Sequence, residues 1–142
     1  MKKILFVCSG NTCRSPMAQG IFNKIAKEKS LDYTAESAGI ITKTGLPYSE
    51  NSVLACKDFD VDITDGKSVS ILDVNLSDYD YFIPMSVSHG QALVAYGVPK
   101  DKIIILKSTG ISDPYGGDLQ IYKDCCQEIY QCILKLVEKL WL

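Results

Sequence analysis

The sequence is short of several features, and each shortage excludes a class of protein. It has no long hydrophobic run, since the longest, residues 4–7 and 103–106, are far too short to cross a bilayer. It has no basic excess: 15 Lys and Arg stand against 17 Asp and Glu, and the net charge of −2 argues against a nucleic-acid partner. No repeat, low-complexity tract or linker interrupts it. We therefore expect one globular domain over residues 1–142, with no membrane partner.

Histidine is nearly missing too, because His89 is the only one, and we expect it on the surface of a helix. Cysteine is plentiful, but Cys-x2-Cys spacing is absent, so no zinc site is expected. The apolar stretch at residues 4–7 is too short for a signal peptide. The six cysteines therefore indicate a cytoplasmic protein with reduced thiols rather than a secreted disulfide scaffold.

Strand-like and helix-like segments alternate along the chain, which is typical of a parallel sheet covered by helices. The expected strands are residues 3–7, 33–38, 81–85 and 102–107. The expected helices are residues 15–29, 50–59, 88–96 and 118 to the end. This order predicts an α/β fold, a three-layer sandwich with a four-stranded parallel sheet and helices on both faces. Ligands bind beyond the carboxyl ends of such strands, so the connections that follow them should line one mouth.

The connection after the first strand reads Cys8-Ser9-Gly10-Asn11-Thr12-Cys13-Arg14-Ser15. Glycine and asparagine tolerate left-handed backbone, so successive N–H groups can turn inward around an anion, and the helix that follows adds positive potential. Arg14 offers paired donors to a tetrahedral oxyanion, and the same field favours a Cys8 thiolate. Ser15 is expected to donate to that sulfur and to cap the helix, with Pro16 at its first position. The combination predicts a phosphate-binding loop with Cys8 as its nucleophile.

Residues 7–18 resemble the signature of the low-molecular-weight protein tyrosine phosphatases. Ser37-Ala38-Gly39 is similar to that family's next common element and Asp113-Pro114 to its acid motif, so the resemblance spans nearly the whole chain. It implies hydrolysis of phosphotyrosine or phosphoarginine on proteins through a phosphocysteine, with no metal or cofactor. Cys8, Arg14 and Asp113 would be catalytic, Asp113 acting as general acid and then as base. Phosphate or a similar oxyanion would be bound by Ser9, Gly10, Asn11, Thr12, Cys13, Arg14 and Ser15.

The resemblance also implies supporting residues. A strained Asn11 would be held by a hydrogen bond to Ser37, with Ser15 alongside. The family usually has a histidine that braces this asparagine, but an ungapped alignment places Gly66 there, so the brace is incomplete. Cys13 corresponds to a family thiol that can form a reversible disulfide with the nucleophile, a redox role. The alternative is a packed thiol behind the loop.

The substrate side chain is open between two candidates. Phosphotyrosine-specific members often carry a bulky aliphatic residue where this chain has Thr12, and an aromatic wall in the loop that here begins at Ile40. These departures, together with Tyr115 after Asp113-Pro114, resemble the bacterial protein-arginine phosphatase branch. A threonine hydroxyl can position a polar guanidinium, and Tyr115 can stack on either leaving group.

Three other functions share this fold or loop. A thiol-dependent arsenate reductase needs two further cysteines after the third strand, and residues 85–89 supply none. A cysteine-phosphorylated sugar-transport carrier needs neither Arg14 nor an acid. A non-catalytic phosphate-binding regulator would not need Cys8, Arg14 and Asp113 all intact.

Overall fold

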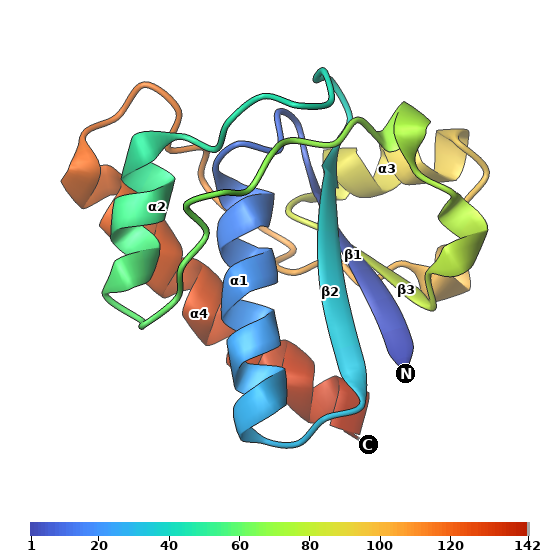
Figure 1. Cartoon of the computed structure of the whole chain (residues 1–142). Coiled ribbons are helices and arrows are strands. Elements are labelled where there is room, and N and C mark those ends of the chain that lie inside the picture. Colours follow the sequence, from blue (N-terminus) through green and yellow to red (C-terminus); the bar gives the residue numbers. More distant parts are fainter. Residues whose placement is uncertain (142) are drawn as a thin grey trace.

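The computed structural model describes residues 1–141, and in that range three parallel strands form a sheet in the order β2–β1–β3 (Figure 1). The strands are β1 (Lys2–Cys8), β2 (Tyr33–Gly39) and β3 (Tyr81–Pro84). β1 is central and pairs with both neighbours, Ile4 facing Ala35 on one side and Tyr81 on the other. The last five residues of β1 are all buried, as expected for a parallel strand covered on both faces.

The helices are α1 (Arg14–Glu28), α2 (Glu50–Lys57), α3 (Val87–Ala95) and α4 (Leu119–Trp141). Short 3-10 helices at Ile71–Asp73, Leu76–Asp78 and Lys100–Lys102 lie in the connections. α1, α2 and α4 gather on one side of the sheet and α3 lies on the other (Figure 1). The predicted α/β class is therefore confirmed. No helix among residues 1–141 combines the length and apolar character needed to cross a membrane.

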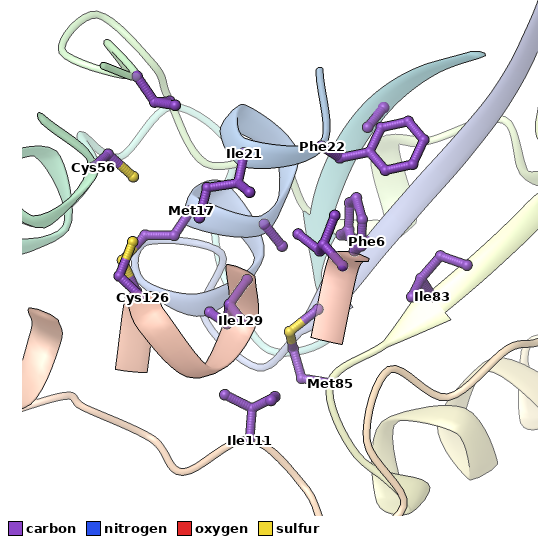
Figure 2. Packing of buried hydrophobic residues seen from close by; sticks show 14 of the residues in the cluster. Phe6, Met17, Ile21, Phe22, Cys56, Ile83, Met85, Ile111, Cys126 and Ile129 are labelled. Atoms are coloured by element: carbon purple, nitrogen blue, oxygen red, sulfur yellow. The ribbon is translucent and has the colours of Figure 1, made fainter. Parts of the chain in front are cut away.

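Alternation along β1 divides the core in two. Ile4, Phe6 and Cys8 belong to the larger cluster under α1 and α4, whereas Leu5 and Val7 belong to the smaller cluster under α3. Figure 2 shows Met17 and Ile21 of α1 and Ile129 of α4 among the residues that surround Phe6 in the larger cluster. Cys8, at the carboxyl end of the strand, therefore lies on the same face of the sheet as Ile4 and Phe6, the face that α1 covers.

The predicted fourth strand, residues 102–107, is not a strand in the structure. The segment does run beside β3: Ile104 N–H donates to Phe82 O at 2.9 Å, and Leu106 N–H donates to Pro84 O at 3.0 Å. The pairing is reduced to an isolated bridge between Phe82 and Ile103. Pro84 explains this, because proline has no N–H to return to the neighbouring segment on the side where its carbonyl already accepts.

The first helix also begins earlier than predicted, at Arg14 rather than at Pro16. Ser15 and Pro16 therefore lie inside its first turn. The N-cap residue is Cys13, which makes no side-chain capping hydrogen bond. The expected serine cap is wrong, and the Ser15 hydroxyl is available for another partner.

Candidate active site

The loop between β1 and α1 closes around the sulfur of Cys8, which is buried at 2% exposure. Asn11 has a φ of 55°, the left-handed conformation that turns the chain back, and its N–H points to Cys8 Sγ at 3.3 Å. Ser15 Oγ lies 2.8 Å from the same sulfur. Ser15 Oγ also accepts a hydrogen bond from Asn11 Nδ2 at 2.8 Å, so its own hydrogen is free to point at the sulfur.

The protonation of Cys8 reflects two opposing influences. Burial is the larger and raises the pKa of the thiol, because a thiolate loses solvation inside the protein. Hydrogen bonds from Ser15 and Asn11 and the positive charge of Arg14 lower the pKa. Every polar neighbour of the sulfur therefore favours its charged form.

The structure brings Arg14 and Asp113 together at the mouth of this loop. Arg14, 7% exposed, donates from one guanidinium nitrogen to Ile111 O at 3.0 Å. Its other terminal nitrogen lies 3.6 Å from Asp113 Oδ2. One cavity of about 280 Å³ is lined by the loop residues 8–14 together with Ile41, Asp113 and Tyr115. A buried cation, a sulfur and a half-exposed carboxylate thus face one space.

Asn11 is braced differently from what the resemblance implied. Its Oδ1 accepts from Val69 N–H at 2.8 Å, and its amide nitrogen donates to Ser15. In the described residues Ser37 donates to Gln19 Oε1 rather than to Asn11. The left-handed Asn11 is therefore held by the segment after α2 and by the first turn of α1.

The space expected for a histidine side chain at position 66 is filled by Tyr48. A Cβ on Gly66 would lie only 2.0 Å from Tyr48 Cε2, so the tyrosine ring and a side chain at 66 exclude one another. Burial raises the pKa of Tyr48, and a hydrogen bond with Ser37 acts in the opposite direction. Ser37 thus belongs to a neighbouring group with Gln19 and Tyr48, outside the cavity that holds Cys8.

His89 is not the surface residue that the sequence predicted. It is buried at 8% exposure, its Nε2 lies 2.9 Å from Ser9 Oγ, and its Nδ1 lies 2.8 Å from Ser86 Oγ. Burial lowers the pKa of His89, as does the charge of Arg14, while Asp113 raises it. Nothing in the local pattern of α3 points to Ser9, so the sequence missed this contact. A serine at position 86 indicates where α3 begins, but it does not indicate that His89 contacts Ser9.

Three residues were expected to select the substrate: Thr12, Tyr115 and Ile40. Ile40 is partly buried against the smaller core cluster, whereas Ile41, 79% exposed, lines the cavity. The structure therefore places Ile41, rather than the predicted Ile40, at the cavity, because successive side chains of this segment face the core and the surface in turn. Tyr115 is also 79% exposed and lines the cavity from the segment that precedes α4. Thr12 is partly buried in the loop between β1 and α1.

Cys13 lies behind the loop, at 6% exposure. Its sulfur is 3.4 Å from Tyr122 Oη of α4 and 3.6 Å from Ser49 Oγ at the start of α2. The cysteines are all free thiols in the structure. The redox role of Cys13 stays a prediction.

The model of the family "Low molecular weight phosphotyrosine protein phosphatase" matches residues 3–141. The chain is 31% identical to a protein-arginine-phosphatase of Bacillus subtilis, over 96% of this chain and 95% of that protein. It is 34% identical to the low-molecular-weight protein-tyrosine-phosphatase PtpB of Staphylococcus aureus, over 94% and 96% of the two chains. A solved low-molecular-weight protein tyrosine phosphatase from T. tengcongensis has a TM-score of 0.92 and 39% identity, with 98% of this chain and 99% of that chain covered.

Proposed function

Because the chain belongs to the low-molecular-weight phosphotyrosine protein phosphatase family and is a cysteine-based phosphatase hydrolase, we propose which of its residues carry the reaction. Cys8 is the nucleophile, Arg14 and the N–H groups of residues 9–14 bind the phosphoryl oxygens, and Asp113 moves the proton. The observation that carries this assignment is that Arg14 and Asp113 meet, at 3.6 Å, over the loop that encloses the Cys8 sulfur. Residues from distant parts of the chain thereby supply a nucleophile, an anion site and an acid in one cavity.

In the first step the Cys8 thiolate attacks phosphorus in line with the leaving group and forms an S–P bond. The bond from phosphorus to the leaving atom breaks, oxygen in phosphotyrosine or nitrogen in phosphoarginine, and that atom takes a proton from Asp113. Arg14 and the loop N–H groups stabilise the charge on the three remaining oxygens. Ser15, 2.8 Å from the sulfur, stabilises the thiolate before this attack and again when the thiolate departs in the second step.

In the second step water attacks the phosphocysteine. Asp113, now a carboxylate, accepts the proton of that water, the S–P bond breaks, and its electron pair returns to Cys8 as thiolate. Inorganic phosphate leaves. The cycle restores every protein group to its starting state and consumes one water molecule.

We assign the substrate as a phosphorylated side chain on a protein, with phosphoarginine the first candidate and phosphotyrosine the second. Thr12 lines the cavity, and it supports phosphoarginine because a hydroxyl at this position can make a polar contact where an aliphatic residue favours a phenyl ring. The arginine phosphatase of Bacillus subtilis and the tyrosine phosphatase of Staphylococcus aureus are similar to this chain to nearly the same degree, 31% and 34%. Overall similarity therefore does not rank the candidates, and the cavity residue does.

Three further assignments accompany the reaction. The whole chain acts as one phosphatase domain, which the family match over residues 3–141 supports. The protein works in the cytoplasm, where thiols stay reduced. Cys13 protects the nucleophile by forming a reversible disulfide with it under oxidising conditions.

Hydrolysis of p-nitrophenyl phosphate tests the assignment of Cys8. Cys8→Ser should lower kcat by about 10⁴-fold or more, since loss of a nucleophile removes the covalent route. Cys132→Ser is the matched control, because Cys132 lies half-buried on α4, and it should retain full activity. Turnover by Cys8→Ser at the rate of the unmodified protein would refute the mechanism.

The substrate assignment needs a second measurement. The unmodified protein should show a higher kcat/KM on phosphoarginine peptides than on phosphotyrosine peptides of the same sequence. A higher value on phosphotyrosine would reverse the order of the two candidates. Arsenate reduction coupled to a thiol reductant should be absent.

A further inference from the structure

His89 lies behind the phosphate loop and makes contacts that the reaction as described does not use. Its imidazole bridges two serines, Ser86 at the start of α3 and Ser9 next to the nucleophile, at 2.8 and 2.9 Å. It is 8% exposed, and in the described part of the chain no buried polar side-chain atom lacks a hydrogen-bond partner. Such a bridge between α3 and the loop constrains Ser9 in a way that packing alone does not.

The backbone and side chain of Ser9 are held from opposite sides. Ser9 O accepts a hydrogen bond from Ile41 N–H at 2.9 Å, which ties the main chain to the connection after β2. Its hydroxyl meets His89 of α3, and the residue lines the same cavity as Cys8 and Arg14. A hydroxyl held at this position is a potential donor to an anion in the cavity, in addition to the loop N–H groups.

Counting hydrogens shows how His89 can prepare that donor. Burial and the charge of Arg14 lower the pKa of His89, so the ring is neutral near pH 7 and one nitrogen carries a hydrogen. Ser86 Oγ already accepts from the backbone N–H of His89 as the cap of α3, and it lies 3.0 Å from Ser88 Oγ. With the exposed Ser88 hydroxyl donating to Ser86, the Ser86 hydrogen goes to Nδ1. The ring hydrogen then sits on Nε2 and donates to Ser9 Oγ. Ser9 then accepts from the histidine, so its own hydroxyl hydrogen can be donated to another acceptor.

We propose that His89 is a positioning residue of the phosphatase: it donates Nε2–H to Ser9 Oγ and thereby directs the Ser9 hydroxyl hydrogen to an oxygen of the bound oxyanion. The inference rests on the proposed function of the loop and adds to it a side-chain donor and the residue that orients it. The opposite tautomer would make Ser9 donate to the ring and would leave no hydroxyl hydrogen for the oxyanion.

Direct binding of inorganic phosphate, measured by isothermal titration calorimetry, tests this without depending on turnover. Ser9→Ala and His89→Ala should each weaken phosphate binding about tenfold, the effect of one hydrogen bond to a charged group. The double variant should also lose about tenfold rather than a hundredfold, because both changes remove the same donor. Gln91→Ala, an exposed position on α3, is the control and should bind like the unmodified protein.

Conservative variants separate positioning from general packing. His89→Gln keeps an amide nitrogen near the place of Nε2 and should recover part of the affinity, whereas His89→Asn retains only the reach of Nδ1 and should not. Should His89→Ala fail to fold, as seen by circular dichroism, the loss in Ser9→Ala and its partial rescue by Ser9→Thr carry the test. Additive losses, or unchanged binding by folded His89→Ala, would overturn the proposal.

The tautomer can be read directly, because His89 is the only histidine and gives a single set of imidazole signals. Long-range ¹H–¹⁵N spectra with phosphate present should show the hydrogen on Nε2, and a hydrogen on Nδ1 would overturn the assigned direction. Failure of the proposed function looks different. In that case the unmodified protein would neither bind phosphate nor hydrolyse p-nitrophenyl phosphate, and the variants could not differ from it.

Discussion

Two strand-to-helix junctions lie at the same edge of the sheet, and their helices begin in different ways. α3 follows β3 after a short connection, and the Ser86 side chain caps it by accepting from His89 N–H. α1 follows β1 after the longer loop of residues 9–13, and its N-cap, Cys13, makes no side-chain capping bond. The first N–H groups of a helix need partners from outside it. In α3 a serine side chain accepts from one of them, whereas in α1 no capping side chain does, and we expect its first N–H groups to face a bound anion.

The comparison extends to the second helical position, which is serine in both helices. Ser15 of α1 is fully buried and contacts Cys8 and Asn11. Ser88 of α3 is exposed and contacts only Ser86 among the hydrogen bonds of the described residues. A serine at the second helical position therefore hydrogen-bonds the nucleophile's sulfur in α1 and faces solvent in α3. The loop that precedes the helix, rather than the helix itself, makes the difference.

Replacing the first residue of each helix gives the largest expected contrast. Arg14→Lys should lower kcat/KM on p-nitrophenyl phosphate by about 10³-fold or more, because lysine lacks the paired donors that match two phosphoryl oxygens. Arg14 is also the only arginine in the chain, so no neighbour can replace it. Val87→Ala, at the first position of α3, should leave the rate unchanged. Equal effects of the two changes would show that the junctions do not differ in function.

The acid lies outside both junctions, and its effect should depend on the substrate. Asp113→Asn should slow phosphoenzyme formation by about 10²-fold for leaving groups that are poor, such as phenol, and far less for p-nitrophenol. A poor leaving group needs the proton, whereas a good one departs as an anion. Pre-steady-state kinetics with a series of aryl phosphates would measure this. Asp101→Asn, on an exposed 3-10 helix, is the control, and an equal loss across the series would contradict an acid role for Asp113.

The two serines at the second helical position sharpen the comparison further. The hydrogen bond from Ser15 lowers the pKa of the Cys8 thiol, so Ser15→Ala should raise that pKa further. The midpoint of alkylation by iodoacetamide should move to higher pH, with about tenfold slower labelling below it. Ser88→Ala should leave the midpoint in place. A shift to lower pH in Ser15→Ala would mean that the serine does not donate to the sulfur.

Within the first junction, Thr12 should affect choice of substrate more than rate. Thr12→Ile should move the ratio of kcat/KM for phosphoarginine over phosphotyrosine by about tenfold towards phosphotyrosine, since it replaces a polar contact by an apolar one. The measurement uses matched peptides and the two proteins side by side. Thr12→Ser retains the hydroxyl and should keep the preference. An unchanged ratio in Thr12→Ile would remove Thr12 as the selector.

The local sequence pattern was sufficient to predict most of the secondary structure around the site. The buried run of β1, the Gly and Asn in the loop and the amphipathic α1 predicted a strand, an anion-binding turn and a helix in their correct order. The pattern gave a wrong prediction where one residue type is compatible with two structural roles. Ser15 was expected both to contact the sulfur and to cap the helix, and only the sulfur contact is present. Pro84 permits β3 yet prevents regular pairing with the segment beyond it.

By itself the sequence determined the α/β class, the loop around Cys8 and the location of Arg14, because these depend on backbone preferences and spacing over a few residues. Tertiary structure alone decided that Asp113 meets Arg14, that His89 reaches Ser9 and that Tyr48 fills the space beside Gly66. Each of these contacts joins segments separated by many residues along the chain. Such contacts follow from how strands and helices pack, and a local pattern of residue types carries no record of that packing.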